Sequence, residues 1–294
     1  GILAMQEALG LTDDQIIIKR NVTEDAACET ALRELVEQGC QVIFGCSFGY
    51  MDYMAELAEE YPEVIFSHCS GYKSNETNFN NYFGRIYQAR YLSGIIAGMK
   101  TETNKIGYVA AMGQENGEVT SGCNAFAMGV ASVNPDAEVY VSVTNSWFDP
   151  EGEKQAAERL IAEGCDVIGQ HCDSAQPQLV AAENNVFGCG YNSDMTEQAP
   201  NAHLTAAIWH WDVYYQAAIE TAMTCGGAEN FVTEMGGNAY YAGLSEGFVD
   251  ASTLNELVAA PGTAAAMEAV RELIDSGRQQ AVEELGEIFS EISL

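Results

Sequence analysis

Short apolar runs alternate with longer amphipathic segments along most of the chain. The apolar runs predict strands at 16–19, 41–46, 63–68, 105–111, 138–144, 166–170, 186–191, 203–209 and 239–244. Apolar residues spaced three and four apart predict helices at 24–38, 51–60, 87–99, 117–132, 151–163, 175–184, 212–225 and 262–276, followed by a polar, helix-prone tail. Because strands alternate with helices throughout, we predict an α/β fold with mostly parallel sheets.

One stretch of this pattern occurs twice. Residues 32–46 read LRELVEQGCQVIFGC and residues 157–171 read AERLIAEGCDVIGQH. In each copy an amphipathic helix ends at a glycine, Gly39 or Gly164, which suits the left-handed position after a helix, and a short apolar strand follows. A weaker second match, between YPEVIFSHCSG and ENNVFGCGYNS, occurs in the same order. The repetition predicts two similar, Rossmann-like lobes.

The map of elements suggests where these lobes begin and end. We place the first lobe at 1–105 plus about 205–235, and the second at 106–204 plus about 236–294. Residues 3–10, LAMQEALG, read as the end of a helix with a glycine stop. A mature α/β protein normally opens on a strand, so we expect an upstream segment, with the first strand of the first lobe, outside this sequence.

The charge balance limits the partners that the protein can have. The chain of 294 residues holds 12 Lys and Arg against 43 Asp and Glu, a formal net charge of -31. Such a field repels phosphate backbones and anionic headgroups, so we expect neither nucleic acid nor a membrane surface as a partner. A neutral or cationic solute enters such a field more easily than an anion. Solubility, or life in a salty habitat, is the alternative explanation of the acidity.

The nine cysteines do not predict a disulfide framework, because their number is odd and the chain is large. Most lie in apolar strands, where cysteine behaves as a small hydrophobic residue, and they indicate a reducing environment. The adjacent His171, Cys172 and Asp173 cannot all chelate one ion, and no second cluster has ligand spacing. Residues 107–117 lack a G-x-G-x-x-G pattern. We therefore expect no metal, no cofactor and no catalytic residue.

The loops after the predicted strands are the expected location of a ligand, because ligands of open parallel sheets bind beyond the carboxyl ends of the strands. These loops are 46–52, 69–73, 112–117, 145–149, 171–174, 191–195 and 209–212. They are rich in aromatic residues, Asn, Ser and Asp, and Lys73 is almost their only basic residue. That composition suits a flat, neutral, hydrogen-bonding solute and does not suit a phosphorylated one.

Four aromatic residues of these loops are candidate ligand contacts. Phe48 follows a buried strand and precedes a glycine, Tyr50 stands two positions later, and Trp147 lies between a strand and a helix. A packing role is the alternative for Phe48 and for Trp147. Trp209 lies at an expected crossover between lobes, where hinge packing and ligand contact are both open.

Two carboxylates complete the candidate site. Asp194 ends a predicted strand, and because an unpaired buried carboxylate is costly, it is either an anchor suited to a pair of ribose hydroxyls or a helix cap. Asp173 is a similar but weaker candidate. Asp149 precedes Pro150 at a helix start and is instead predicted to be a structural N-cap.

Several stretches resemble the basic membrane protein (BMP) family, whose members are lipid-anchored substrate-binding components of ABC importers. The stretches are VIFGCSFGYMD, NYFGRIYQARYLSGIIAG, NKIGYVAAM, VNPDAEV, NSWFDP, GYNSDM and AHLTAAIWHWDVYY, and they run through nearly the whole chain. The resemblance implies the type I periplasmic-binding-protein fold, with two Rossmann-like lobes joined by three crossovers. Better-understood members of the family bind purine nucleosides.

The resemblance also implies roles for individual residues. Phe48 matches a cleft aromatic of the first lobe, Trp147 an aromatic of the second, and Asp194 an aspartate that holds the ribose. This chain departs from the pattern at Trp209, where nucleoside-binding relatives have a lysine. The NSWFDP variant resembles a branch that takes a bare purine base such as adenine.

We therefore expect a monomeric, extracytoplasmic solute-binding protein of a bacterium, anchored as a lipoprotein through a segment outside this sequence. It would close on a purine base or nucleoside between its lobes and dock on a membrane permease, without chemically changing the solute. One alternative is the ligand-sensing domain of a regulator or receptor, which shares the fold. The other is a nucleoside-processing enzyme, which would need a carboxylate cluster or a base–nucleophile pair that the sequence does not show.

Overall fold

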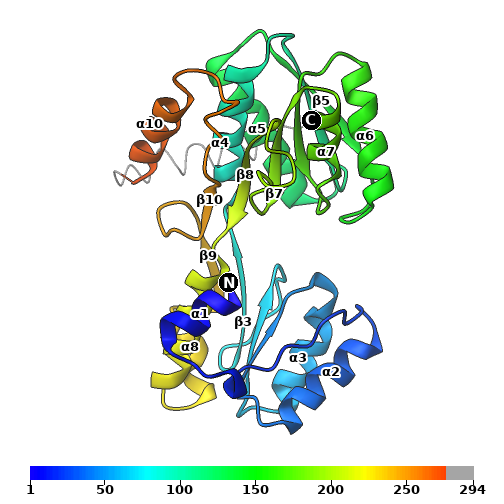
Figure 1. Ribbon diagram of the computed structural model, residues 1–294. Helices are drawn as coiled ribbons and strands as arrows, with labels where there is room; N and C mark the ends of the chain where they lie inside the picture. Colours follow the sequence, from blue (N-terminus) through cyan, green and yellow to red (C-terminus); the bar gives the residue numbers. More distant parts are fainter. Residues whose placement is uncertain (276–294) are drawn as a thin grey trace. The chain divides into compact units, whose positions relative to one another are not determined.

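The computed structural model describes residues 1–275, which divide into two compact units (Figure 1). Unit 1 consists of Gly1–Gly84 and His210–Ala242, and unit 2 of Arg85–Trp209 and the described residues from Gly243 to Asp275. The chain therefore passes between the units three times. Within the described residues, no helix is both long enough and apolar enough to span a membrane.

Unit 1 is a parallel four-stranded sheet with helices on both faces (Figure 1). Its strands, in spatial order, are β1 (Val42–Gly45), β2 (Ile65–Cys69), β3 (Phe79–Gly84) and β9 (Ala239–Ala242). The helices are α1 (Ile2–Leu9), α2 (Ala26–Glu37), α3 (Met51–Glu60), α8 (Trp211–Thr224) and the short α9 (Phe231–Glu234). Leu32 of α2 and Met54 of α3 are buried with Phe66 and Phe79 in the core on one face. On the other, the Tyr214 hydroxyl of α8 lies 2.6 Å from the Ser67 hydroxyl.

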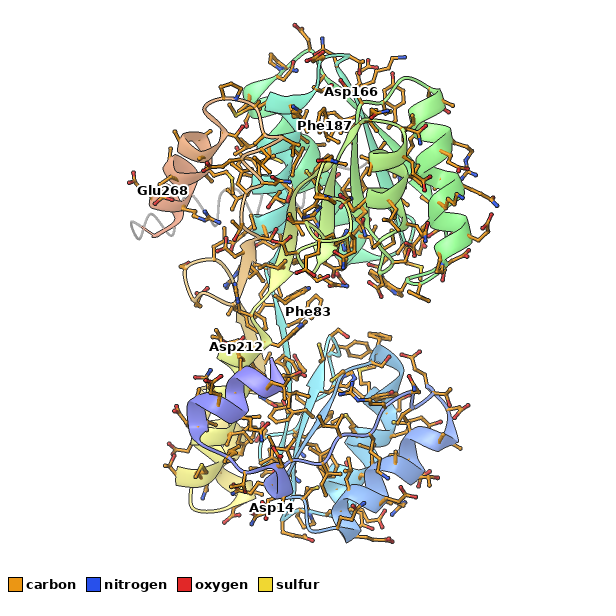
Figure 2. All side chains as sticks on the ribbon, in the orientation of Figure 1. Asp14, Phe83, Asp166, Phe187, Asp212 and Glu268 are labelled. Atoms are coloured by element: carbon orange, nitrogen blue, oxygen red, sulfur yellow. The ribbon has the colours of Figure 1, made fainter. Side chains whose placement is uncertain are left out.

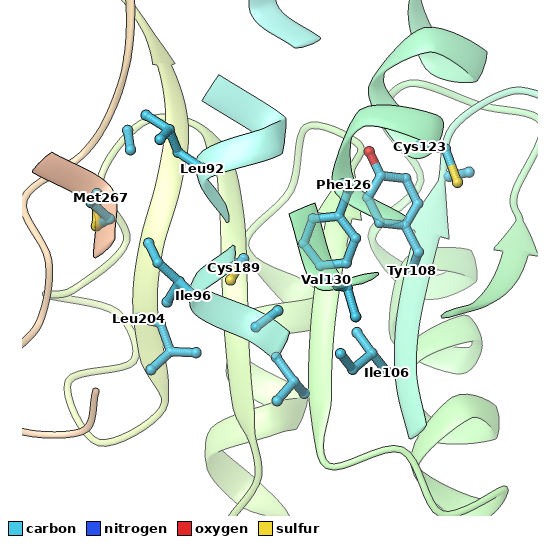
Figure 3. Packing of buried hydrophobic residues seen from close by; sticks show 14 of the residues in the cluster. Leu92, Ile96, Ile106, Tyr108, Cys123, Phe126, Val130, Cys189, Leu204 and Met267 are labelled. Carbon is cyan, nitrogen blue, oxygen red and sulfur yellow. The ribbon is translucent and has the colours of Figure 1, made fainter. Parts of the chain in front are cut away.

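Unit 2 is a six-stranded sheet, parallel except at one edge. Its strands, in spatial order, are β10 (Val249–Ala251), β8 (His203–Trp209), β7 (Phe187–Asn192), β6 (Val167–His171), β4 (Lys105–Ala110) and β5 (Glu138–Val143), with β10 antiparallel. Helices α4 (Ile86–Lys100) and α5 (Gly117–Val133) cover one face, α6 (Pro150–Ala162) and α7 (Gln176–Glu183) cover the other, and α10 (Thr263–Asp275) packs on α4 (Figure 1). Figure 3 shows Leu92 and Ile96 of α4 with Phe126 and Tyr108 in the main core.

The glycine stops predicted from the repeat are confirmed. Gly39 and Gly164 follow α2 and α6 with φ of 85° and 97°, a region that L side chains rarely adopt. The predicted cap of α6 is also confirmed, because the Asp149 side chain accepts a hydrogen bond from the Gly152 N–H and Pro150 occupies the first turn.

Two strands were not predicted, and one predicted strand is wrong. The run 16–19 follows a short 3₁₀ helix, is not a strand, and leaves Ile17 and Ile18 exposed. Strand β3, FNNYFG, carries two asparagines and a glycine and so lacks an apolar run, although its side chains are mostly buried. Strand β10 has three residues, too few to show a period. The predicted tail beyond residue 276 lies outside the described residues.

The first lobe was expected to reach residue 105, but the structure assigns α4 to unit 2. The reason is close helix packing: a Cβ on Gly94 would lie 2.1 Å from the carbonyl oxygen of Phe126, and one on Gly129 would lie 2.2 Å from that of Tyr91. The backbones of α4 and α5 can approach this closely only because both positions lack a side chain. The segment that returns to unit 1 is His210–Ala242, where about 205–235 was expected.

Gly94→Ala is expected to lower the free energy of unfolding by about 2 kcal/mol or more, because backbone atoms cannot yield to the added methyl group. Gly117→Ala is the matched control, since nothing lies within 4 Å of a Cβ there and the change is expected to stay within about 0.5 kcal/mol. Denaturant unfolding measures both. Equal stability of the two variants would contradict the packing described for α4 and α5.

Candidate functional site

The carboxyl edge of the unit 2 sheet carries a connected group of polar and aromatic side chains, here called the His171 cluster. Its members are Tyr108, Glu118, His171, Tyr191 and Trp209. They come from the adjacent strands β4, β6, β7 and β8 and from the first turn of α5. His171 and Trp209 are the last residues of their strands, so the parallel sheet itself brings the group together.

The cluster is joined by hydrogen bonds. The Tyr108 hydroxyl lies 3.1 Å from His171 Nδ1, and His171 Nε2 lies 3.2 Å from Glu118 Oε1. The Tyr191 hydroxyl donates to the same Glu118 oxygen at 2.8 Å. Burial raises the pKa of that hydroxyl, whereas the Trp209 indole, which lies near it, acts in the opposite direction. A carboxylate only accepts, so Nε2 of the histidine donates to Glu118, and its Nδ1 accepts from Tyr108.

Burial and neighbouring charges set the charge states of Glu118 and His171. Burial, and then the Arg90 charge, lower the pKa of His171 to about 4, so the imidazole is neutral at pH 7. Burial alone would raise the pKa of Glu118, but the His171 and Tyr191 hydrogen bonds and Arg90 outweigh it and lower the pKa. Glu118 is therefore an ionised acceptor beside a neutral ring.

Arg90 of α4 is the buried cation behind the cluster. The residue is 2% exposed, and its guanidinium carbon lies 4.1 Å from the centre of the Tyr191 ring. Its Nη1 donates to the Gln170 carbonyl oxygen, whereas Nε and Nη2 have no hydrogen-bond partner among residues 1–275. The stacked guanidinium holds Tyr191 in place and supplies the positive charge that favours ionised Glu118.

Trp147 borders the cluster from the loop after β5. Its half-buried ring lies 5.9 Å from the His171 ring, centre to centre, at an interplanar angle of 61°. Its carbonyl oxygen accepts a hydrogen bond from the Asp173 N–H at 2.8 Å, which ties two of the predicted ligand loops together. The neighbouring Phe148 is 66% exposed.

The two candidate aspartates have different surroundings. Asp173 accepts a hydrogen bond from the Asn192 amide at 2.9 Å, and burial of its carboxyl group, with nearby Glu153 and Glu118, raises its pKa to about 6. Asp194 is exposed and accepts a hydrogen bond from the Thr196 N–H at 2.8 Å. It therefore stabilises a turn and not a helix.

The two candidate aromatic residues of unit 1, Phe48 and Tyr50, have different surroundings. Phe48 is 56% exposed, and its ring centre lies 6.4 Å from that of exposed Tyr72. Tyr50 packs on the core, and its hydroxyl donates to the Val22 carbonyl oxygen at 2.6 Å. Glu24 fixes the loop by accepting a hydrogen bond from the Gly49 N–H at 2.9 Å. Phe48 thus remains available for a ligand, whereas the hydroxyl of Tyr50 is occupied.

The opposite edge of the unit 2 sheet carries structural hydrogen bonds to a turn. Figure 2 labels Asp166 and Phe187, which lie there at the amino ends of β6 and β7. The Asp166 carboxylate accepts hydrogen bonds from the N–H groups of Glu102 and Thr103, at 2.7 and 3.0 Å, and so anchors the turn before β4.

The structure thus gathers Trp147, Asp173 and Trp209 at one edge of unit 2 and places Phe48 and Tyr50 in unit 1. Glu118, one residue beyond a predicted ligand loop, and Arg90 were not predicted from the sequence, and Tyr191 was included only as the first residue of the predicted ligand loop 191–195. The available signal for Arg90 was its position directly before the mostly apolar run YLSGIIAG, where a charged residue is unexpected. Among residues 1–275 the structure shows no group of three or more His, Cys, Asp or Glu side chains that could hold a metal ion.

Acidification is expected to destabilise the protein through two buried histidines. The pKa of His171 and that of His203 are each lowered by burial to about 4, against an ordinary value of 6.5. Between these values the unfolded chain binds more protons than the folded protein, so the free energy of unfolding rises with pH up to about 6.5 and then levels off. Asp173, whose pKa is raised to about 6, has the opposite sign over part of this range and reduces the slope.

Denaturant unfolding at about pH 4.5 and about pH 7 measures this dependence. The midpoint is expected to be lower at the acidic pH. His203→Gln removes one of the two histidines and is expected to narrow the difference. An unchanged difference in that variant would show that His203 does not contribute.

Comparison with known proteins gives one family and two informative relatives. The chain matches the family model described as Bmp, ABC transporter substrate-binding protein PnrA-like, over residues 2–275. A putative ABC transporter glucose-binding protein of Haloferax volcanii is 42% identical over 66% of this chain and 49% of that protein. A purine-binding protein of Brucella abortus is 39% identical over 71% of this chain and 59% of that protein. The chain thus spans about half to three fifths of the length of these curated relatives.

Solved structures share the fold at low identity. An ABC transporter solute-binding protein from Conexibacter woesei has a TM-score of 0.74 at 18% identity, covering 93% of this chain and 88% of that one. A transcriptional activator of the comK gene from Bacillus halodurans has a TM-score of 0.78 at 21% identity, covering 94% and 92%. The predicted α/β fold of the type I periplasmic-binding-protein class is confirmed.

Proposed function

Since the chain belongs to the Bmp family of ABC transporter substrate-binding proteins, we propose that it binds a purine base or nucleoside for import. The family membership confirms the resemblance found in the sequence. The Brucella relative named as purine-binding supports the choice of solute. Solute-binding proteins do not transform their solute, and we propose the same here, so incubation with inosine should release no free base.

The observation that carries this proposal is the arrangement at the carboxyl edge of unit 2. Half-buried Trp147 offers an aromatic surface beside neutral His171, and ionised Glu118 offers an acceptor in the same group. A purine needs both, because its faces stack on rings and its edge carries N–H donors. The net charge of -31 disfavours a phosphorylated form of the same solute.

We propose roles for the remaining candidates within each unit. Phe48 offers an exposed aromatic ring on unit 1 as a ligand contact. Trp209 shapes the site through Tyr191 instead of supplying the cationic donor that a lysine would give. Asp173 and Asp194 serve ribose hydroxyls when a nucleoside is bound, since carboxylates accept such donors well.

A sugar is the second candidate solute. The Haloferax relative is named as glucose-binding, and the Asp173–Asn192 pair offers the acceptor and donor groups that sugar hydroxyls require.

The partners follow from the family. We propose that the protein acts outside the cytoplasm as a monomer, held at the membrane by a lipid anchor, and presents its solute to an ABC permease. A regulatory role is the alternative, since a transcriptional activator of Bacillus subtilis is 23% identical over 88% of this chain.

Thermal unfolding with bases, nucleosides and sugars tests the solute, because a ligand specific to the folded protein raises its melting temperature. Mass spectrometry of small molecules released on denaturation is the companion measurement. Adenine or adenosine should raise the melting temperature and glucose should not. A shift with glucose alone would replace the purine proposal with the sugar candidate.

A further inference from the structure

We propose that Glu118 selects the ligand of unit 2 by its hydrogen-bond donors. Its carboxylate accepts a hydrogen bond from an N–H group of an aromatic heterocycle, so the ligand class is a neutral or cationic base that carries such a donor. The inference deepens the proposed function and rests on it, and it adds a residue that the sequence analysis did not single out.

The hydrogen bonds of Glu118 leave one oxygen for a ligand. Within the described residues, the bonds from His171 and Tyr191 both end on Oε1. The side chain is 19% exposed, so the carboxylate is held by the protein without being sealed from solvent. A carboxylate offers about four acceptor positions. Oε2 is therefore available at the surface where a solute arrives.

The surroundings hold this acceptor in place and keep it charged. Glu118 lies in the first turn of α5, where the partial positive charge of the helix end favours an anion. Tyr191, which orients the carboxylate, is itself held by the guanidinium of Arg90, whose central carbon lies 4.1 Å from the centre of its ring. The side chain thus meets the ligand already oriented, which lowers the entropic cost of binding.

The position beside Trp147 defines the class of ligand. Glu118 and Trp147 both neighbour the His171 side chain, at 3.2 Å between Glu118 Oε1 and His171 Nε2 and at 5.9 Å between the Trp147 and His171 ring centres. We infer from this shared neighbour that a ring stacked on the indole has its edge at the carboxylate. An edge with an exocyclic amine or a ring N–H gains a charge-assisted hydrogen bond. An edge that carries only acceptors, or an anion, meets repulsion.

A cycle of protein and ligand changes tests the inference by calorimetric titration. The ligands are adenine, N6,N6-dimethyladenine, which lacks the exocyclic donors, and 9-methyladenine, which lacks the ring N–H. The proteins are the unchanged chain, Glu118→Gln, and Glu115→Gln. Glu115 is an exposed carboxylate in the loop directly before α5. Its variant therefore has the same change of charge as Glu118→Gln but leaves the contacts of Glu118 in place.

The unchanged chain should bind at least one methylated ligand about tenfold or more weaker than adenine. Glu118→Gln should bind adenine about tenfold more weakly than the unchanged chain does. The ratio of the affinity for adenine to the affinity for the weaker methylated ligand, here called the methylation penalty, should fall at least about threefold in this variant. Glu115→Gln should keep the full penalty. Thermal unfolding checks that each variant folds.

Each other outcome overturns the inference in a distinguishable way. If adenine binds but neither methylated ligand is weaker in the unchanged chain, no donor is selected, and this result needs no variant. An equal methylation penalty in Glu118→Gln would mean that Glu118 acts only on the fold. If no purine binds the unchanged chain, the proposed function itself fails.

Discussion

Trp147→Ala is expected to weaken adenine binding about tenfold or more. The substitution removes the aromatic surface next to His171, and loss of one stacked ring costs on the order of 1 kcal/mol beyond the lost contact area. Trp147→Phe keeps a ring and should lose less. Titration calorimetry with adenine measures all of these affinities.

Phe148→Ala is the matched control for Trp147, because the neighbouring ring is 66% exposed and does not border the His171 cluster. Its affinity for adenine is expected to stay within about twofold of the unchanged chain. Trp147 also packs against two clusters of buried hydrophobic residues in unit 2. The melting temperature of each variant must therefore be compared with that of the unchanged chain. Unchanged affinity in Trp147→Ala would remove this residue from the site.

Arg90→Ala is expected to lower the free energy of unfolding by about 3–5 kcal/mol. The change leaves a void where a fully buried side chain stood, removes the cation stacked on Tyr191, and leaves the Gln170 carbonyl oxygen without this donor. Denaturant unfolding measures the loss.

Arg90→Met separates volume from charge. Methionine fills most of the space, and the change also removes two donor nitrogens that have no hydrogen-bond partner within the described part of the chain. This variant should therefore lose clearly less stability than Arg90→Ala. The Met variant should still bind adenine more weakly, because Tyr191 and Glu118 lose the charge that orients them. A loss below about 1 kcal/mol in Arg90→Ala would contradict a structural role for the guanidinium.

The part of the fold that sequence could predict is the part determined by local pattern. Gly39 and Gly164 end their helices through a local backbone conformation that does not depend on the rest of the fold. The strands that follow them are recognisable from their own apolar residues. Strand β3 was missed because its burial comes from neighbours on both sides, which the residues FNNYFG do not reveal. The assignment of α4 to unit 2 depends on a helix contact at Gly94 that no local pattern contains.

The candidate site divides in the same way. The rule that ligands bind at the carboxyl ends of parallel strands selected the loops that carry Trp147 and Asp173, which the structure joins at one edge of unit 2. Trp209 was expected at a crossover of the first lobe, whereas the structure places it at the end of β8 in unit 2. Glu118 could not be predicted, because its role depends on hydrogen bonds from β6 and β7 to the first turn of α5. Arg90 was hidden for a similar reason, since its partner ring lies on β7.

The central claim is that the solute is a purine, and the most direct measurement is calorimetric titration of the 294-residue chain with adenine and, separately, with glucose. We expect saturable binding of adenine with a negative heat-capacity change, as burial of an aromatic surface requires, and no binding of glucose. Binding of glucose without binding of adenine would show that the solute is not a purine.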